Sequence, residues 1–265
     1  MQTGFAFTKL ADRLTSITEL SADDLDLLAK MPCTIGHYAP HESILRKDDR
    51  RPCCCLLLQG YLCWKHAEGR GGQITSIHVP GDIPDLDTVI SSELEPNLSA
   101  LGPVVVALVP HSFFHEISSR SLGLSRGLSL LRLAEAARLR NWIVNLGSRD
   151  ALTRVAHLIC EITCRLRAVG LAREYRLLSP FTQSDLAAAC AISAVHANRT
   201  IQQLRRGGML QWKSRTITVT DWHALARLAG FKPDYLGLRD TGLVLPSHPY
   251  KLVPSPAEPE LSLQN

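Results

Sequence analysis

Six side chains with the chemistry to recognise DNA bases lie close together near residue 200. They occupy consecutive turns of one segment: Val195, His196, Asn198, Arg199, Gln202 and Gln203. An arginine can bond both acceptors of guanine, an asparagine can form two hydrogen bonds with adenine, and a valine can contact the thymine methyl group. No acidic residue occurs between residues 191 and 212, as a surface facing phosphate groups requires. This composition predicts a surface that binds duplex DNA.

Two helices are expected to position these side chains. Thr182, followed three residues later by Asp185, is suited to begin a helix over residues 183–190. After a three-residue break, Ser193 is suited to begin a second helix over residues 194–206. A short helix, a brief turn and a second helix form a helix-turn-helix. Its second helix places its N-terminal residues against base edges in the major groove.

A β-hairpin is expected directly after the second helix. Gly207-Gly208 ends the helix, and residues 209–213 and 216–220 alternate in polarity like two strands. Lys213 and Arg215 near the hairpin tip are expected to reach backbone phosphates. The full predicted DNA-binding set is Thr182, Gln183, Ser193, Val195, His196, Asn198, Arg199, Gln203, Arg206, Lys213 and Arg215.

The first half of the chain has a different pattern. Ser21 is suited to cap a helix over residues 22–29, and residues 32–109 hold short runs of strand formers separated by glycine or proline. The expected strands span residues 43–46, 53–58, 61–66, 73–79 and 104–109. Many short strands with regular turns predict a small antiparallel roll or barrel.

Residues 112–169 have only helical character. A seam with steps of four and three residues runs along this region: Leu130, Ala134, Ala137, Asn141 and Val144. Such a seam suits pairing with a second helix, and a packing face within the chain is the alternative. Gly147 is expected to end the long helix and Asp150 to begin the next.

Charge is distributed unevenly along the 265 residues. Residues 1–119 hold 9 Lys and Arg against 15 Asp and Glu, whereas residues 120–171 and 172–232 each hold 9 against 3. A basic rear half is expected to meet a polyanion. No apolar run approaches the length of a membrane helix and no signal peptide is evident, so a cytoplasmic protein without membrane contact is expected. The proline-rich residues 237–265 are expected to be a disordered tail.

The eight cysteines are expected to be reduced thiols, with neither a metal site nor a cofactor. Cys53, Cys54 and Cys55 alternate between the two sides of a strand, so they cannot ligate one metal together. Core packing is the expected role of these thiols and of the pair Cys160 and Cys164. Cys190 ends the first helix of the motif, and a redox brake on DNA binding is an open alternative there.

The helix-turn-helix segment resembles that of the cyclic-AMP receptor/fumarate-nitrate regulator (CRP/FNR) superfamily. The resemblance rests on Thr182-Gln183, Asp185-Leu186-Ala187, the stretch ending in Asn198-Arg199, Leu204-Arg205-Arg206, residues 146–151 and 154–158, Gln59-Gly60 and residues 79–82. It covers about residues 20–236. It implies a homodimer paired through a central helix over about residues 124–146, a roughly palindromic operator and contact with RNA polymerase.

Cyclic-nucleotide members of that superfamily hold the cyclic phosphate with a Gly-Glu pair and a later Arg-Ser or Arg-Thr pair. Here the corresponding effector-pocket candidates are Gly81, Asp82, Leu98 and Ser99. No Lys or Arg occurs between residues 71 and 119, and a buried phosphate without a charge partner is costly. We therefore expect no binding of cAMP or cGMP in the usual mode. Since only Cys33 lies in the first 50 residues, an N-terminal iron–sulfur cluster is also not expected.

The sequence thus predicts an α+β protein. It would have a β-roll sensor domain (double-stranded β-helix) over residues 1–119, a dimerisation helix over 120–147 and a winged helix-turn-helix domain over 148–236. The predicted function is sequence-specific DNA binding in transcription control. The alternative is a sensor or protein-interaction module whose helix-turn-helix is degenerate. No catalytic triad, zinc-protease, P-loop or dinucleotide motif is present, so an enzyme is not expected.

Overall fold

The computed structural model describes residues 2–46, 49, 51–66, 72–91, 97–172, 174–179 and 181–239. Two helices open the chain, α1 (Gln2–Thr15) and α2 (Ala22–Ala29). The predicted cap of α2 is confirmed. The Asp24 backbone N–H donates to Ser21 Oγ at 3.1 Å, and the Ser21 N–H donates to the Asp24 carboxylate at 2.9 Å. These reciprocal bonds satisfy two donors that a helix start otherwise leaves without partners.

The β-roll consists of two antiparallel sheets. One sheet has the order β1-β7-β3 and the other β2-β6-β4-β5. The elements are β1 (Thr34–Tyr38), β2 (Ser43–Leu45), β3 (Cys53–Gln59), β4 (Leu62–His66), β5 (Gln73–His78), the 3-10 helix η1 (Leu86–Val89), β6 (Leu98–Ala100) and β7 (Val104–Pro110). All five predicted strands are present. The strands β1 and β6 were not predicted, because one contains a glycine among polar residues and the other has only three residues.

The cysteine run on β3 follows the alternation of a strand. Cys54 packs in the hydrophobic cluster formed with α1, whereas Cys55 packs between the two sheets with Leu57 and Leu98. Burial raises the pKa of both thiols above the ordinary value. These two cysteines therefore serve the core, as expected from the sequence.

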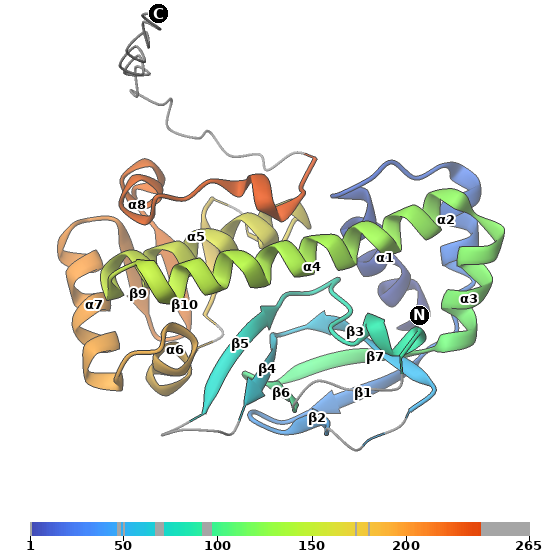
Figure 1. Ribbon diagram of the computed structural model, residues 1–265, viewed down its shortest axis with the longest axis horizontal. Helices are drawn as coiled ribbons and strands as arrows, with labels where there is room; N and C mark the ends of the chain where they lie inside the picture. The colour runs from blue at the N-terminus through green and yellow to red at the C-terminus, as the bar shows by residue number, and fades with distance from the viewer. Residues whose placement is uncertain are drawn as a thin grey trace, which may run out of the picture.

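Three helices follow the roll: α3 (His111–Arg120), α4 (Leu122–Ser148) and α5 (Ala151–Ala168). The long helix α4 crosses the molecule from α3 at one end to the helix-turn-helix at the other (Figure 1). The helix α4 ends at Ser148, one residue beyond the end predicted at Gly147. Gly147 lies exposed within the last turn, and the chain becomes extended at Arg149, where Asp150 caps α5 through the Thr153 N–H at 2.8 Å.

The C-terminal unit contains the predicted winged helix-turn-helix. Its elements are β8 (Arg176–Leu178), α6 (Gln183–Cys190), α7 (Ala194–Arg206), β9 (Leu210–Lys213), β10 (Thr216–Val219), α8 (Trp222–Ala229) and the 3-10 helix η2 (Pro233–Leu236). The order of the small sheet is β8-β10-β9. The bounds of α6 and α7 are those predicted from the caps.

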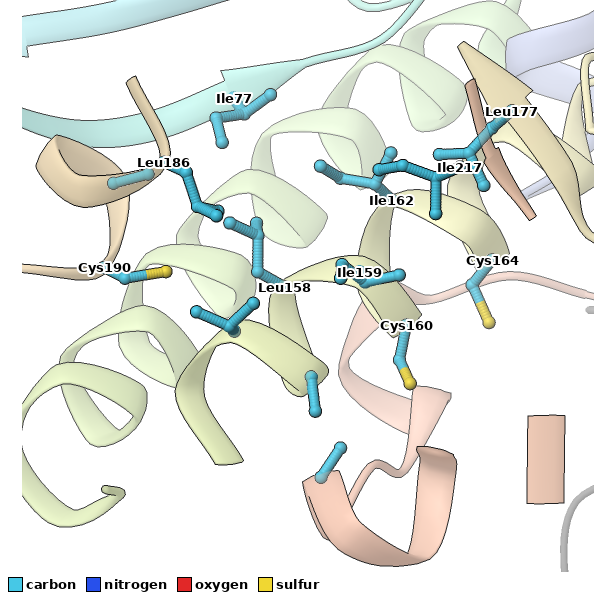
Figure 2. Close-up of a cluster of buried hydrophobic side chains, with 14 of the residues drawn as sticks. Ile77, Leu158, Ile159, Cys160, Ile162, Cys164, Leu177, Leu186, Cys190 and Ile217 are labelled. Atoms are coloured by element: carbon cyan, nitrogen blue, oxygen red, sulfur yellow. The ribbon is translucent and has the colours of Figure 1, made fainter. Parts of the chain in front are cut away.

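One hydrophobic cluster joins the C-terminal unit to the roll. Ile77 of β5 lies near Leu158 on α5 and Leu186 on α6 (Figure 2), and all three side chains are buried. Tyr61, beside β4, also donates a hydrogen bond from its hydroxyl to the Leu178 carbonyl at 2.7 Å. The two units therefore share a core. Residues on both sides of the domain boundaries expected from the sequence contribute to it.

The chain then returns along α4. Gly237 comes close to Ala134 on α4, and the Arg239 backbone N–H donates to the Ser16 carbonyl at 2.9 Å. The prediction of a tail starting at residue 237 is therefore wrong for residues 237–239, because Leu238 packs against two hydrophobic clusters. Residues 240–265 lie outside the described residues.

Candidate nucleic-acid interface

Local capping fixes the geometry of the helix-turn-helix. Thr182 Oγ1 accepts from the Asp185 N–H at 3.1 Å, and the Asp185 carboxylate accepts from the Thr182 N–H at 3.0 Å. Ala191 adopts a left-handed conformation (φ 52°, ψ 46°) and ends α6. Ser193 then begins α7 by accepting a hydrogen bond from the His196 N–H at 3.2 Å. These caps set the start and direction of the second helix.

The helix α7 divides into a buried and an exposed side. Ala197, Thr200 and Leu204 are buried, since residues three and four apart share one face of a helix. The opposite side carries the exposed members of the predicted set: Val195, His196, Arg199, Gln203 and Arg206. Val195 is 64% exposed. An apolar side chain so exposed is suited to contact a thymine methyl group.

Part of the predicted set surrounds a hollow of about 330 Å³ beside α7. Thr182 and Gln183 line it from the start of α6, Asn198 and Gln202 line it from α7, and Ser214 lines it from the hairpin tip. Asn198 is only half-buried. The structure thus brings the starts of both helices and the wing around one depression next to the exposed face of α7.

The two cations of the wing lie in different surroundings. The strands β9 and β10 pair antiparallel around the tip, and Lys213 is exposed. The Arg215 guanidinium instead lies against the roll, because a Cβ added at Gly102 would sit 2.8 Å from Arg215 Nη2. In this arrangement Arg215 stands at the roll, apart from the other predicted DNA contacts.

Part of the predicted seam of α4 is buried within the chain. Ala134 is 6% exposed, and Leu130 packs against the N-terminal cluster, so these two residues serve the chain's own core. The exposed apolar side chains of α4 stand elsewhere: Leu122, Leu133, Leu139, Ile143 and Val144. Of the predicted seam, Val144 belongs to this exposed set, whereas Ala137 and Asn141 are intermediate in exposure. Leu130 and Ala134 of the predicted seam thus pack within the chain, whereas Val144 is exposed, and the pairing of α4 with a second helix stays a prediction.

The effector-pocket candidates have other roles in the structure. Leu98 is fully buried between the sheets, and Ser99 on β6 pairs with Ser43 and Cys63. A Cβ at Gly81 would lie 2.8 Å from the Arg13 Cβ, so α1 lies directly over this turn. Sheet packing and α1 thus occupy the surroundings of Leu98 and Gly81, whereas Asp82 lines a hollow of about 130 Å³ together with Arg13 and Arg138.

Asp82 belongs to a buried ionic cluster that the sequence analysis missed. Its carboxylate accepts from Arg13 Nε at 2.9 Å and from the Arg165 guanidinium of α5. Burial alone raises the pKa of Asp82, but Arg165 and Arg13 outweigh it and hold that pKa well below its ordinary value. We define the buried ionic cluster as Arg13, Asp82, Glu161, Arg165 and Tyr235.

The other members extend the cluster to the C-terminal segment. Arg165 Nη1 lies 3.4 Å from the Glu161 carboxylate and donates to the Ile77 carbonyl at 2.7 Å. The Tyr235 hydroxyl donates to Glu161 at 2.7 Å. The cluster therefore connects α1, the turn after β5, α5 and η2. No local sequence signal marks it, since Asp82 lies 69 and 83 positions from its two arginines.

The thiol at the end of α6 is buried. Burial raises the pKa of Cys190 to about 12. The Cys190 thiol therefore stays protonated at neutral pH, which argues against the reactive thiolate that a redox brake needs. Within the described ranges, no group of three or more His, Cys, Asp and Glu residues is placed to hold a metal ion. No described helix is long and apolar enough to cross a membrane.

Comparisons with known proteins agree with this geometry. Residues 153–228 match the Crp-like helix-turn-helix domain. A fumarate and nitrate reduction regulatory protein of Shigella dysenteriae is 28% identical over 159 residues, covering 60% of this chain and 63% of that protein. An anaerobic regulatory protein of Pasteurella multocida is 27% identical, covering 60% of this chain and 58% of that protein. The chain thus spans less than two thirds of the length of these curated relatives.

Solved structures share the fold across most of the chain. FixK2 from Bradyrhizobium japonicum covers 75% of this chain and 98% of its own, with 22% identity and a TM-score of 0.66. A CooA mutant from Carboxydothermus hydrogenoformans covers 83% and 95%, with 16% identity and a TM-score of 0.58.

A β-roll, a long central helix and a winged helix-turn-helix are the fold that this chain shares with FixK2. Residues 153–228 thus match the Crp-like helix-turn-helix domain, and the chain is similar in sequence to fumarate and nitrate reduction regulatory proteins.

Proposed function

We propose that this protein regulates transcription in the cytoplasm as a homodimer that binds a roughly palindromic DNA operator. The observation that carries the proposal is the exposed face of α7, where Val195, His196 and Arg199 project from the first turns. The N-terminal turns of a recognition helix are the part that meets base edges in the major groove. The hollow beside α7 adds Asn198 and Gln183 at its rim.

The charge of this surface supports the same proposal. Arg199, Arg206 and Lys213 are exposed, and residues 191–212 contain no acid. Phosphate contacts from such cations release counterions, so the affinity falls steeply as salt rises. In contrast, Asp185, the acid nearest the start of α7, is buried and engaged by the cap of α6.

The exposed stripe of α4 supports the dimer. Leu133 is 62% exposed, and Ile143 and Val144 are exposed about three turns further along the same helix. Leu133 and Val144 are eleven residues apart, about three turns of a helix, so they lie on the same face of α4. We propose that a second copy covers this stripe through its own α4. RNA polymerase as a partner is implied by the superfamily resemblance.

Selection from random DNA followed by fluorescence anisotropy tests the proposal. The selected operator is expected to be a palindrome, with log Kd rising linearly with log salt. Arg199→Ala should cost about 1–3 kcal/mol and flatten the preference at one base pair of each half-site. Lys213→Ala should weaken binding to all sequences about equally.

Lys30→Ala is the matched control, since Lys30 is an exposed cation next to α2, outside the helix-turn-helix. It should leave operator binding unchanged. Salt-insensitive or absent DNA binding would support a degenerate helix-turn-helix, and an unchanged operator ranking in Arg199→Ala would refute the role given to that residue.

A further inference from the structure

A second cavity lies where the roll, α1, α5 and the wing meet. Its volume is about 630 Å³, and we call it the junction cavity. Leu58 and Tyr61 line it from the roll, Leu166 lines it from α5, and Leu178 lines it from β8. It is separate from the hollow beside α7, with which it shares no lining residue. Protein sites for small molecules are mostly apolar and span roughly 300–1,000 Å³, so the junction cavity has the size of a ligand site.

The walls expose more apolar surface than packing within the chain requires. Leu178 is 67% exposed and Leu171 is also exposed, whereas Leu58, Tyr61 and Leu166 behind them are buried. The apolar lining of the cavity therefore extends from its buried wall to its solvent-exposed opening. An apolar ligand body seated here would remove both leucines from water, which favours binding.

The charged groups of the cavity have one sign. Lys9 of α1 and Arg215 of the wing line it, and its lining includes no Asp or Glu. Lys9 also acts on Asp12, whose pKa is raised by burial and lowered by the Lys9 ammonium. Arg215 differs, since its guanidinium makes no hydrogen bond or ion pair with another side chain among the described residues, and only its backbone carbonyl bonds, to the Ser179 N–H.

Gly102 allows the Arg215 guanidinium to stand at the cavity. A Cβ at position 102 would lie 2.8 Å from Arg215 Nη2, closer than real Cβ contacts. The fork of guanidinium N–H groups matches a carboxylate, which it can bind through two parallel hydrogen bonds. The combination is an apolar space with one well-placed anion receptor at its edge.

We propose that the junction cavity binds a small amphiphilic monocarboxylate, with its carboxylate on Arg215 and its apolar body among Leu58, Leu166 and Leu178. The site lies between the two units, which the Tyr61 hydroxyl already bridges at 2.7 Å. A ligand that binds only this docked arrangement stabilises it by RT ln(1 + [L]/Kd). The ligand also holds the Arg215 guanidinium at the roll and keeps it from the phosphate contact predicted from the sequence, so the ligand weakens operator binding. This last effect rests on the proposed DNA-binding function.

Calorimetry with the full chain and no DNA tests the site itself. The probes are decanoate and 2-naphthoate, with decanol as the uncharged counterpart of decanoate. At least one carboxylate is expected to bind saturably with one site per chain. Decanol should bind at least about tenfold more weakly than decanoate, since a charge-assisted hydrogen bond contributes about 1.5–3 kcal/mol. Failure of both carboxylates to bind would overturn the proposal.

Two matched wing variants locate the site. Arg215→Gln should weaken carboxylate binding at least about tenfold, whereas Lys213→Gln, which removes an exposed cation two positions away, should not change it. Arg215 is exposed, so its variant is expected to fold, and a thermal melt verifies this. Equal binding by Arg215→Gln and the unmodified chain would refute the assignment of the receptor.

The regulatory consequence is measured separately. Adding the bound carboxylate should weaken operator binding in the unmodified chain and leave the residual binding of Arg215→Gln unaffected. A chain that binds the carboxylate but no DNA would refute the proposed function and keep the site. A chain whose operator affinity ignores the bound carboxylate would refute the coupling.

Discussion

Removing the Asp82 carboxylate should be among the most destabilising single substitutions at the buried contact between the roll and the C-terminal unit. Its side chain is 4% exposed, and the side chains of Arg13 and Arg165 are 4% and 3% exposed. Asp82→Ala leaves two guanidinium groups buried without their shared anion. Losing one partner of a buried ion pair costs about 3–5 kcal/mol. For a chain of this size each kcal/mol shifts the Tm by about 2–4 °C, so the Tm should fall by about 6–20 °C.

Urea denaturation followed by circular dichroism, with calorimetric melting as a second probe, measures this loss. The matched control is Asp87→Ala, five residues away. Asp87 also pairs with an arginine, Arg132 at 3.1 Å, but its side chain is 81% exposed. Exposed pairs contribute about 0–1 kcal/mol, so this variant should stay near the unmodified chain. If the two variants lose similar stability, the ionic cluster does not hold the units together in the way argued above.

Three further predictions concern other parts of the molecule. Burial raises the pKa of Asp85 to about 6, so the folded state holds this proton more tightly than the unfolded state and stability falls as the pH rises from about 4 to 6. Asp85→Asn should therefore increase the free energy of unfolding by about 1–3 kcal/mol above pH 7 and change it little below pH 4, as urea denaturation at both pH values can show. Leu133→Glu on the exposed stripe of α4 should shift the protein toward monomer in sedimentation velocity, while Ile90→Glu, at an even more exposed apolar site on the roll, should not. Calorimetry should detect no cAMP binding, because Asp82 is engaged by Arg13 and Arg165; saturable binding at micromolar concentrations would refute this expectation.

Local signals made the helix-turn-helix predictable to the residue. Thr182, Ser193 and Gly207 each act within a few positions of the helix end that they define, so the sequence alone contains the determinants of α6 and α7. The roll was predicted from turns and strand formers in the same way. The strands that escaped prediction, such as β6 with three residues, are held by their neighbours more than by their own composition.

Features that depend on contacts between residues far apart in the sequence could not be predicted from the sequence. The face of α4 that is exposed depends on which other segments pack against this helix. The chain passes Ala134 again near Gly237, and Ala134 is buried, although heptad spacing alone assigned Ala134 to the contact with a second helix. The same limit applies to Asp82, which a motif comparison places in an effector pocket and the fold places between two arginines. Spacing describes a helix or strand well, and it carries no information on which distant element packs against it.

The return of the chain to α1 also constrains how the protein is made. A ribosome releases Arg13 and Asp82 early, but Arg165 and Tyr235 only after most of the polypeptide has been synthesised. Until then the Asp82 carboxylate of the nascent roll can pair with Arg13 but not with Arg165. Ile77 also lacks the side chains of α5 that later cover it. Domains generally fold as units during synthesis. Here the first unit completes its interior only when nearly the last described residue has emerged, so we expect that interval to be when the nascent chain depends most on chaperones.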